Sequence, residues 1–334
     1  MLSYSSIVST VRSACAPYRS RVSWKRAGVA ILLILLIGGY YIAFAPPADF
    51  SPGSIVRVSR GTSVPEIAAE LADARIISHP SVLRALLRLS GKSGSVQTGV
   101  YQFTTPQNAF VVAYRLATGA YGLPPVRITF VEGTTVREAA AHVASSMPDI
   151  SADEFLTAAE GKEGYLFPDT YFFQPSDDAA SIVAAMRGNF DTKIAPIVPA
   201  IGASGHSLAD IVTMASIVEK EARTSADRRM VAGILWNRIK LGMPLQVDAV
   251  FGYIFGRTTY SPSPADLKVP SPYNTYLHAG LPPGPIDNPG LDSLEAAASP
   301  TKTNYLYYLT GHDGLMHYAT TYAGHQTNLR RYLN

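Results

Sequence analysis

Two glutamates inside an apolar run, Glu219 and Glu221, are the side chains of this sequence most suited to acid–base chemistry. They lie in ASIVEKEART, residues 215–224. A helical period through this segment places apolar residues from Leu208 to Ala222 on one face. At about 100° per residue, Glu219 falls inside the apolar face and Glu221 on its shoulder. A carboxylate beside apolar groups has a raised pKa, as a general acid near neutral pH requires, so Glu221 fits that role better.

Each glutamate also has a structural interpretation. A carboxylate in a core must be paired or neutral, so we expect Glu219 to be a structural or supporting residue with a partner on the next helix. The candidate partners are Arg228, Arg229 and Arg238. Glu221 has an alternative role as an exposed residue paired with Lys220 or Arg223, and the helical period does not decide between the two roles.

The elements that position these glutamates follow from the surrounding pattern. A helix is predicted over residues 207–222, and a second over 225–242, which ends at Gly242. Beyond it, PSPYNTY and GLPPGPIDNPG are rich in turn formers and predict loops. The C-terminal part predicts a short helix at 293–300, a hairpin from NYLYYLT and LMHYATT with GHDG as its turn, and a last helix.

The N-terminal half contains a weak internal repeat. RVSRGTSVPEIAAEL (57–71) and TFVEGTTVREAAAHV (129–143) each predict a strand, a turn and a helix. The helices begin at capping boxes, Ser63 with Glu66 and Thr135 with Glu138. In the first copy, HPSVLRALLRLSG predicts a second helix and GVYQF a closing strand. This order has the size of a LysM-like glycan-binding module, and a plain α+β support domain is the alternative.

A stretch of 19 uncharged residues, 27–45, is long enough to span the ~30 Å core of a bilayer. Tyr40 and Tyr41 near its end suit a membrane interface, and the basic residues before it predict a cytoplasmic N-terminus. AFA before Pro46 also resembles a signal-peptide cleavage site. The stretch is long for a signal peptide, so we interpret it as a retained anchor, followed by a linker over residues 46–53.

The charge of the chain is concentrated at its N-terminus. The 334 residues carry a formal net charge of +3, and residues 1–26 contain five basic residues and no acidic one. The remainder therefore has a net charge of −2, and we expect no binding to nucleic acid. Cys15 is the only cysteine, which excludes a disulfide framework and a cysteine-rich metal site.

Five motifs follow one another along the second half of the chain: EGYLFPDTY (163–171), MASIVEKEA (214–222), WNRIKLGMPLQVDA (236–249), PSPYNTYLHAGLPPGPIDNPG (270–290) and SLEAAASPTKTNYLYY (293–308). Together they resemble the endolytic murein transglycosylases of the YceG-like family. The resemblance implies lytic cleavage of the β-1,4 bond between N-acetylmuramic acid (MurNAc) and N-acetylglucosamine (GlcNAc), which leaves 1,6-anhydroMurNAc ends. It needs neither a cofactor nor a metal.

The resemblance also implies roles for individual residues. Glu221, the second glutamate of Glu-x-Glu, corresponds to the family's catalytic acid and base. The substrate-binding candidates are Gln246, Asp248, Asn274, Tyr276 and His317. The implied partners are peptidoglycan strands and the peptidoglycan synthases beside which nascent strands are trimmed. The implied location is the outer face of the inner membrane.

The expected fold is α+β: a transmembrane helix at 27–45 after a cytoplasmic segment (1–26), a LysM-like α/β module at 54–125 and a mixed α+β catalytic domain at 126–334, with the catalytic glutamate on a helix. Three alternatives compete with this function. A metal site built from His312, His317 and His325 lacks ligand spacing, and a serine hydrolase using Ser216 lacks a Gly-x-Ser-x-Gly motif. A non-catalytic, membrane-anchored peptidoglycan-binding scaffold is the main alternative.

Overall fold

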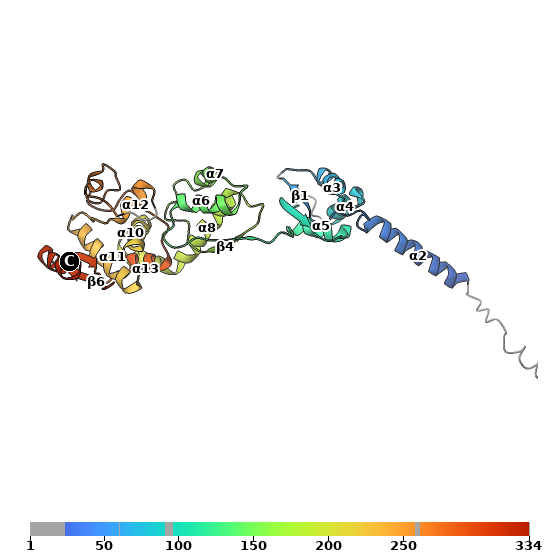
Figure 1. The fold of residues 1–334 in the computed structure, drawn as a ribbon. Coiled ribbons are helices and arrows are strands. Elements are labelled where there is room, and N and C mark those ends of the chain that lie inside the picture. The colour runs from blue at the N-terminus through green and yellow to red at the C-terminus, as the bar shows by residue number, and fades with distance from the viewer. Residues whose placement is uncertain (1–23, 60, 91–95, 258–260, 334) are drawn as a thin grey trace, which may run out of the picture. The chain divides into compact units, whose positions relative to one another are not determined.

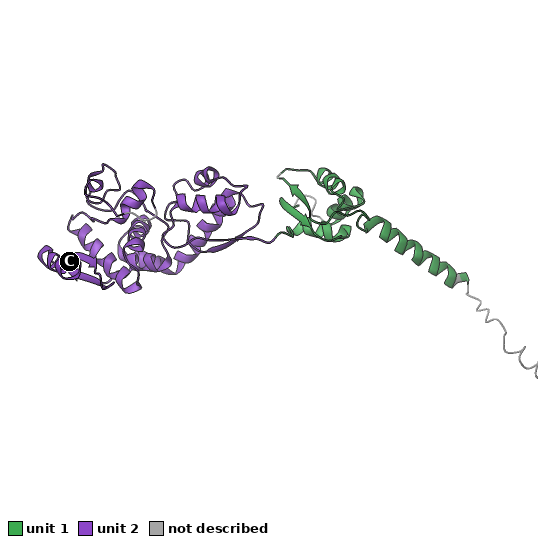
Figure 2. Cartoon of the chain, viewed as in Figure 1, with its two compact units in different colours: residues 1–123 green, residues 124–334 purple. Residues whose placement is uncertain are grey.

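A computed structural model describes residues 24–59, 61–90, 96–257 and 261–333 of the chain (Figure 1). The chain divides into two compact units, residues 1–123 and residues 124–334 (Figure 2). The described part is mixed α+β with one long apolar helix near the N-terminus, as the sequence predicts.

The described part of unit 1 begins with the apolar helix and continues with two strands and three shorter helices. Its elements are α2 (Trp24–Phe44), β1 (Ser54–Val58), α3 (Val64–Asp73), α4 (Pro80–Leu89), β2 (Gly99–Phe103) and α5 (Ala109–Thr118). The strands pair antiparallel, with Val56 opposite Tyr101. Within α2, Arg26–Phe44 is long and apolar enough to cross a membrane.

In its described residues, unit 2 holds most of the helices and two further two-stranded sheets. Its elements are β3 (Val126–Thr129), α6 (Val136–Ser146), α7 (Ala152–Ala158), β4 (Thr170–Phe173), α8 (Ala179–Ile194), η1 (Ala195–Ile197), α9 (Val198–Ser204), α10 (Leu208–Glu221), α11 (Ser225–Lys240), α12 (Ala249–Phe255), η2 (Asp266–Lys268), α13 (Leu291–Ala298), β5 (Tyr307–Thr310), β6 (Met316–Ala319) and α14 (Tyr322–Tyr332). Strands β3 and β4 pair with each other, as do β5 and β6, both antiparallel.

The two helix starts that the capping boxes predict are confirmed. Ser63 and Glu66 form a capping box at α3, and Thr135 and Glu138 form one at α6. In each box the side chains satisfy backbone N–H groups that the first helical turn leaves free. The predicted hairpin at the C-terminus is also confirmed, since Leu309 of β5 lies opposite His317 of β6.

Helix α10 is more buried than its pattern predicts. Every residue from Ile211 to Val218 is buried, so the expectation of a single apolar stripe is wrong. The reason is that α11, α12 and α13 all pack around α10 in the largest hydrophobic core. A second core lies among α6, α7 and α8 and the pair β3–β4. Helix α10 is thus held firmly from several sides.

Gly233 of α11 gives a test of this packing. A Cβ at this position would lie 2.2 Å from the carbonyl oxygen of Thr301, in the segment that follows α13. We expect Gly233→Ala to lower the free energy of unfolding by about 1–3 kcal/mol, as overpacking does. The measurement is chemical denaturation of the full chain in detergent. Gly188→Ala in α8 is the matched control, because no atom lies within 4 Å of its added Cβ, and it should stabilise by up to about 1 kcal/mol. A neutral Gly233→Ala would contradict the close contact.

Candidate active site

Glu221 is the last residue of α10, where the chain turns towards α11. Its Oε2 accepts a hydrogen bond from the hydroxyl of Tyr308 on β5 at 3.0 Å. Burial raises the pKa of Glu221 to about 7; the bond from Tyr308 acts against this rise, and the charge of Asp248 adds to it. A carboxyl with this pKa exists in both forms at neutral pH, so it can donate a proton and later accept one.

Two cavities adjoin at Glu221. Their volumes are about 370 Å³ and about 460 Å³, and both are lined by Glu221 and Asp248. Charged side chains, among them Lys220 and Arg257, line the smaller cavity. The larger is lined mainly by aromatic and polar residues: Gln246, Tyr276, Tyr307, Tyr308, Thr310, Tyr322 and His325. We call these the charged cavity and the tyrosine cavity.

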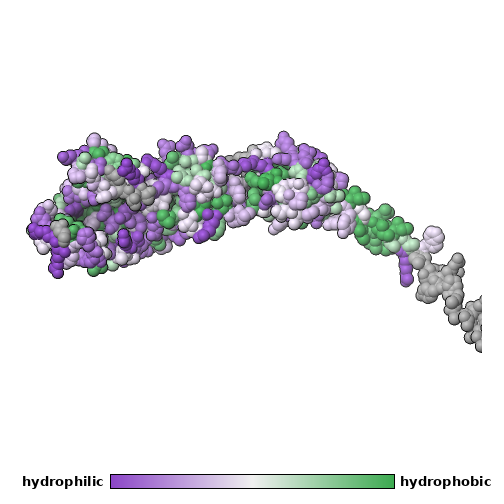
Figure 3. Space-filling view, viewed as in Figure 1, coloured by the Kyte–Doolittle hydropathy of each residue, from purple (hydrophilic) through white to green (hydrophobic). Residues whose placement is uncertain are grey.

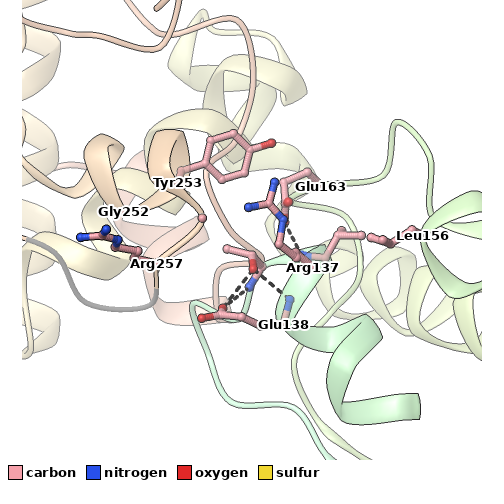
Figure 4. Close-up of a pocket in the computed structure, with 10 residues that line it drawn as sticks. Arg137, Glu138, Leu156, Glu163, Gly252, Tyr253 and Arg257 are labelled. Carbon is pink, nitrogen blue, oxygen red and sulfur yellow. Dashed lines mark hydrogen bonds between the residues drawn. The ribbon is translucent and has the colours of Figure 1, made fainter. Parts of the chain in front are cut away.

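The charged cavity continues into a third space of about 210 Å³ (Figure 4). Both are lined by Thr135, Glu138, Gly252, Tyr253 and Arg257. The third space adds Glu163, whose Oε1 accepts a hydrogen bond from the Val136 N–H at 2.9 Å. Burial raises the pKa of Glu163 to about 7. We call the three spaces together the groove. Its end at the third space therefore carries ionisable groups of both signs.

Three of the predicted substrate-binding residues, Gln246, Asp248 and Tyr276, line the tyrosine cavity. The hydroxyl of Tyr276 donates a hydrogen bond to Oδ1 of Asp248 at 2.6 Å. Gln246 has a φ of 52°, in the left-handed region that residues with a side chain rarely adopt. Its N–H donates to the carbonyl of Thr275 at 3.1 Å. The chain thus holds a strained residue at the groove, a feature that is frequent at functional sites.

The structure places the other two candidates elsewhere. Asn274 is fully buried, and its side-chain amide donates to the carbonyls of Leu267 and Val269, so it organises its own loop rather than lining either cavity. His317 stacks on Tyr332 at 3.4 Å between ring centroids, and its Nε2 lies 2.9 Å from Asp313. It is not among the groove-lining residues given above.

Several groove residues were missed by reasoning from the sequence. Tyr308 comes from β5, and Tyr322 and His325 come from α14, the last helix. The available signal was helical spacing, since Tyr322, His325 and Leu329 are separated by three and four residues and share one face of α14. A pattern within one helix does not show that this face meets Glu221, which lies more than 100 residues earlier.

Glu219 is paired as a core carboxylate must be. Its Oε1 lies 2.7 Å from the guanidinium of Arg228, and its Oε2 accepts a hydrogen bond from the Gly290 N–H at 2.9 Å. Arg228 also binds Asp292 at 2.8 Å. Of the three arginines considered, Arg228 is therefore the partner, and Arg238 instead donates to the carbonyls of Leu245 and Leu306.

The loop GLPPGPIDNPG connects several motifs. The side chain of Asn288 accepts a hydrogen bond from the Leu166 N–H at 2.9 Å and donates to the carbonyl of Thr134 at 2.9 Å. Ser216 accepts a hydrogen bond from the Ile286 N–H at 3.0 Å and is fully buried. Ser216 therefore supports this loop and is not accessible as a nucleophile. Within the described residues, no three His, Cys, Asp or Glu side chains gather to hold a metal ion.

Comparisons with known proteins agree with the motifs. The model of the YceG-like family matches residues 56–331. A Bacillus subtilis (strain 168) protein named endolytic murein transglycosylase is 29% identical over 332 residues, which cover 90% of this chain and 92% of that protein. A protein of the same name from Streptococcus pneumoniae (serotype 2, strain D39) is 26% identical, and the match covers 92% of this chain but 64% of that protein. The crystal structure of a yceG-like protein from Listeria monocytogenes aligns with a TM-score of 0.57 at 28% identity, covering 82% of this chain and 98% of that one.

The bond between Tyr308 and Glu221 has a measurable effect on proton binding. Because this bond lowers the pKa of Glu221, Tyr308→Phe should raise that pKa further, so that the carboxyl stays protonated to higher pH. The measurement is a ¹³C NMR titration of glutamate carboxyl groups, with Glu221→Gln identifying the signal. An unchanged or lowered pKa would contradict the role of Tyr308.

Asp248 should have the opposite effect. Its negative charge raises the pKa of Glu221, so Asp248→Asn should lower that pKa while the amide oxygen still accepts the bond from Tyr276. The same titration tests this. The two variants serve as controls for each other, because general loosening of the site would shift both in the same direction, whereas the structure requires opposite shifts.

Proposed function

Because this chain belongs to the YceG-like family, we propose that it is a lytic transglycosylase that cuts inside the glycan strands of peptidoglycan. Its curated relatives are named endolytic murein transglycosylases. The observation that carries the proposal is Glu221, a carboxyl with a pKa of about 7 at the point where two cavities adjoin. A strand that occupied both cavities would pass directly over it.

The proposed reaction uses one carboxyl group twice. Protonated Glu221 donates its proton to the glycosidic oxygen while the bond from C1 of MurNAc to that oxygen breaks, through an oxocarbenium-like transition state. The C6 hydroxyl oxygen of the same MurNAc then bonds to C1, and its proton passes to ionised Glu221. The products are a 1,6-anhydroMurNAc end and a free GlcNAc 4-hydroxyl. No water is consumed, and Glu221 returns to its protonated form.

Asp248 supports this reaction from the side. An ionised carboxylate in the groove faces the positive charge that develops on the sugar ring. Tyr276 donates to Asp248 at 2.6 Å and holds it in place. The presence of two carboxyl groups, Glu221 and Asp248, also favours a second candidate function, hydrolysis. In that reaction Asp248 would activate water or attack C1. The two functions differ in product, since hydrolysis leaves a reducing end and the lytic reaction leaves an anhydro end.

Unit 1 sets the proposed location. We place residues 1–26 in the cytoplasm and residues 46–334 outside it, with α2 as a single-pass anchor in the inner membrane. The strand–helix–helix–strand order of residues 54–103 supports a LysM-like module, with glycan binding as its proposed role. Cutting would then be restricted to strands near the membrane, where peptidoglycan synthases are the expected partners. A non-catalytic scaffold would keep this location but would not need Glu221.

The decisive experiment is digestion of isolated peptidoglycan by the purified full chain, followed by borohydride reduction and mass spectrometry. Anhydro ends resist reduction, whereas ends made by hydrolysis are reduced. We expect anhydro ends from the wild type and a loss of rate of about 10²–10⁴-fold in Glu221→Gln. Reducible ends would favour hydrolysis, and no new ends would favour the scaffold.

Glu219→Gln is the matched control for this experiment. It removes a carboxylate two residues away that is bound to Arg228 and Gly290. We expect it to destabilise the fold by about 3 kcal/mol, with the folded fraction still forming anhydro ends. A Glu219→Gln protein that is fully folded and as inactive as Glu221→Gln would overturn the assignment of roles.

A further inference from the structure

Helix α5 of unit 1 carries an exposed apolar face. Phe110, Val111 and Tyr114 are 43%, 41% and 66% exposed, and their spacing of one and three residues puts them on one side of the helix. The only charged residue of α5, Arg115, is buried and points away from this face, where it donates to the carbonyls of Gln102, Ala120 and Tyr121. The exposed face of α5 is therefore free of charge.

This face touches the end of the apolar helix α2. The ring of Phe110 stacks on Phe44, the last residue of α2, with 4.5 Å between centroids and 20° between planes. Tyr40, one turn earlier, lies 6.4 Å from Phe110 at 17°. Figure 3 shows hydrophobic residues gathered over α2. Aromatic rings at the end of a membrane-spanning segment lie at the level of the lipid headgroups.

Two further contacts hold the module against the end of α2. The hydroxyl of Ser78 donates to the carbonyl of Ala45 at 3.1 Å. Arg75, between α3 and α4, forms an ion pair with Asp49 of the linker. The segment after α2 is thus attached at two points to the loop between α3 and α4, and α5 is held beside the membrane interface rather than at the end of a free tether.

We propose that Phe110, Val111 and Tyr114 insert into the lipid–water interface of the bilayer that α2 crosses. An uncharged aromatic and aliphatic helix face is the kind that lies in the headgroup region of a membrane. Lipid is favoured over a protein or glycan partner because the face is continuous with the end of the spanning helix, through the stack of Phe110 on Phe44 and Tyr40. The module would then rest on the membrane, and the chain would leave it after residue 123 for unit 2.

The test uses the full chain in lipid nanodiscs with Cys15→Ser and one introduced cysteine carrying a fluorescent label. The label is placed at Thr118, exposed on α5, or at Glu70, exposed on α3. Lipids with a quencher near the headgroup report contact with the interface. We expect at least about twofold stronger quenching at position 118 than at position 70. Equal quenching at the two positions would overturn the proposal.

A second set of variants separates the α5 face from the anchor. Phe110→Ser, Val111→Ser and Tyr114→Ser together should reduce quenching at position 118 to the level at position 70, with α2 unchanged. Leu89→Ser is the matched control, since Leu89 is 85% exposed but lies on α4, and it should change nothing. Quenching that survives the triple substitution would mean that α2 alone sets the position of the label. A label at position 118 that is shielded from the quencher only when peptidoglycan fragments are added would assign the face to glycan. Either result overturns the proposal. Circular dichroism confirms that each variant is folded.

Discussion

The site depends on how α10 ends, with two carboxylates in opposite electrostatic environments. Glu219 is neutralised by Arg228 at 2.7 Å and by the Gly290 N–H at 2.9 Å. This pair joins the end of α10 to the start of α11 and, through Gly290, to the start of α13, and the position of Glu221 follows from it. A buried pair of this kind contributes little net stability compared with apolar packing, but breaking one partner is strongly destabilising. It therefore fixes geometry more than it adds stability.

Among the described residues, the nearby cations Arg228, Arg238 and Lys220 all bind other groups, and burial sets the raised pKa of Glu221. Arg228 binds Glu219 and Asp292, and Arg238 donates to the backbone carbonyls of Leu245 and Leu306. Lys220 donates to the carbonyl of Gly133 at 2.7 Å. The side chain that does bind Glu221 is the neutral hydroxyl of Tyr308, which adjusts the pKa without fixing the carboxyl in its charged form.

The sequence predicted what local patterns encode. Both capping boxes, the α+β class, the helix that carries Glu221, and the pairing of Glu219 with an arginine are confirmed. It did not predict contacts between distant segments: Tyr308 lies 87 residues from Glu221, and no periodic pattern links a strand to a helix at that distance. Asn274 shows a second difficulty, which concerns local contacts. An amide in a motif can bind a ligand or the carbonyls of its own loop equally well, and the sequence does not distinguish the two.

The groove is lined by different kinds of residue on the two sides of Glu221. This difference bears on how a single carboxyl group could carry out the proposed cleavage. A glycan strand has a direction, because each bond joins C1 of one sugar to an oxygen of the next. A strand bound in reverse would present the wrong atoms to Glu221. The tyrosine cavity offers rings with apolar faces and polar edges, whereas Lys220 and Arg257 of the charged cavity offer cations. Under the proposed function, groups of different chemistry on the two sides of the cut bond would bind in one direction only, and that direction brings the glycosidic oxygen to the proton of Glu221.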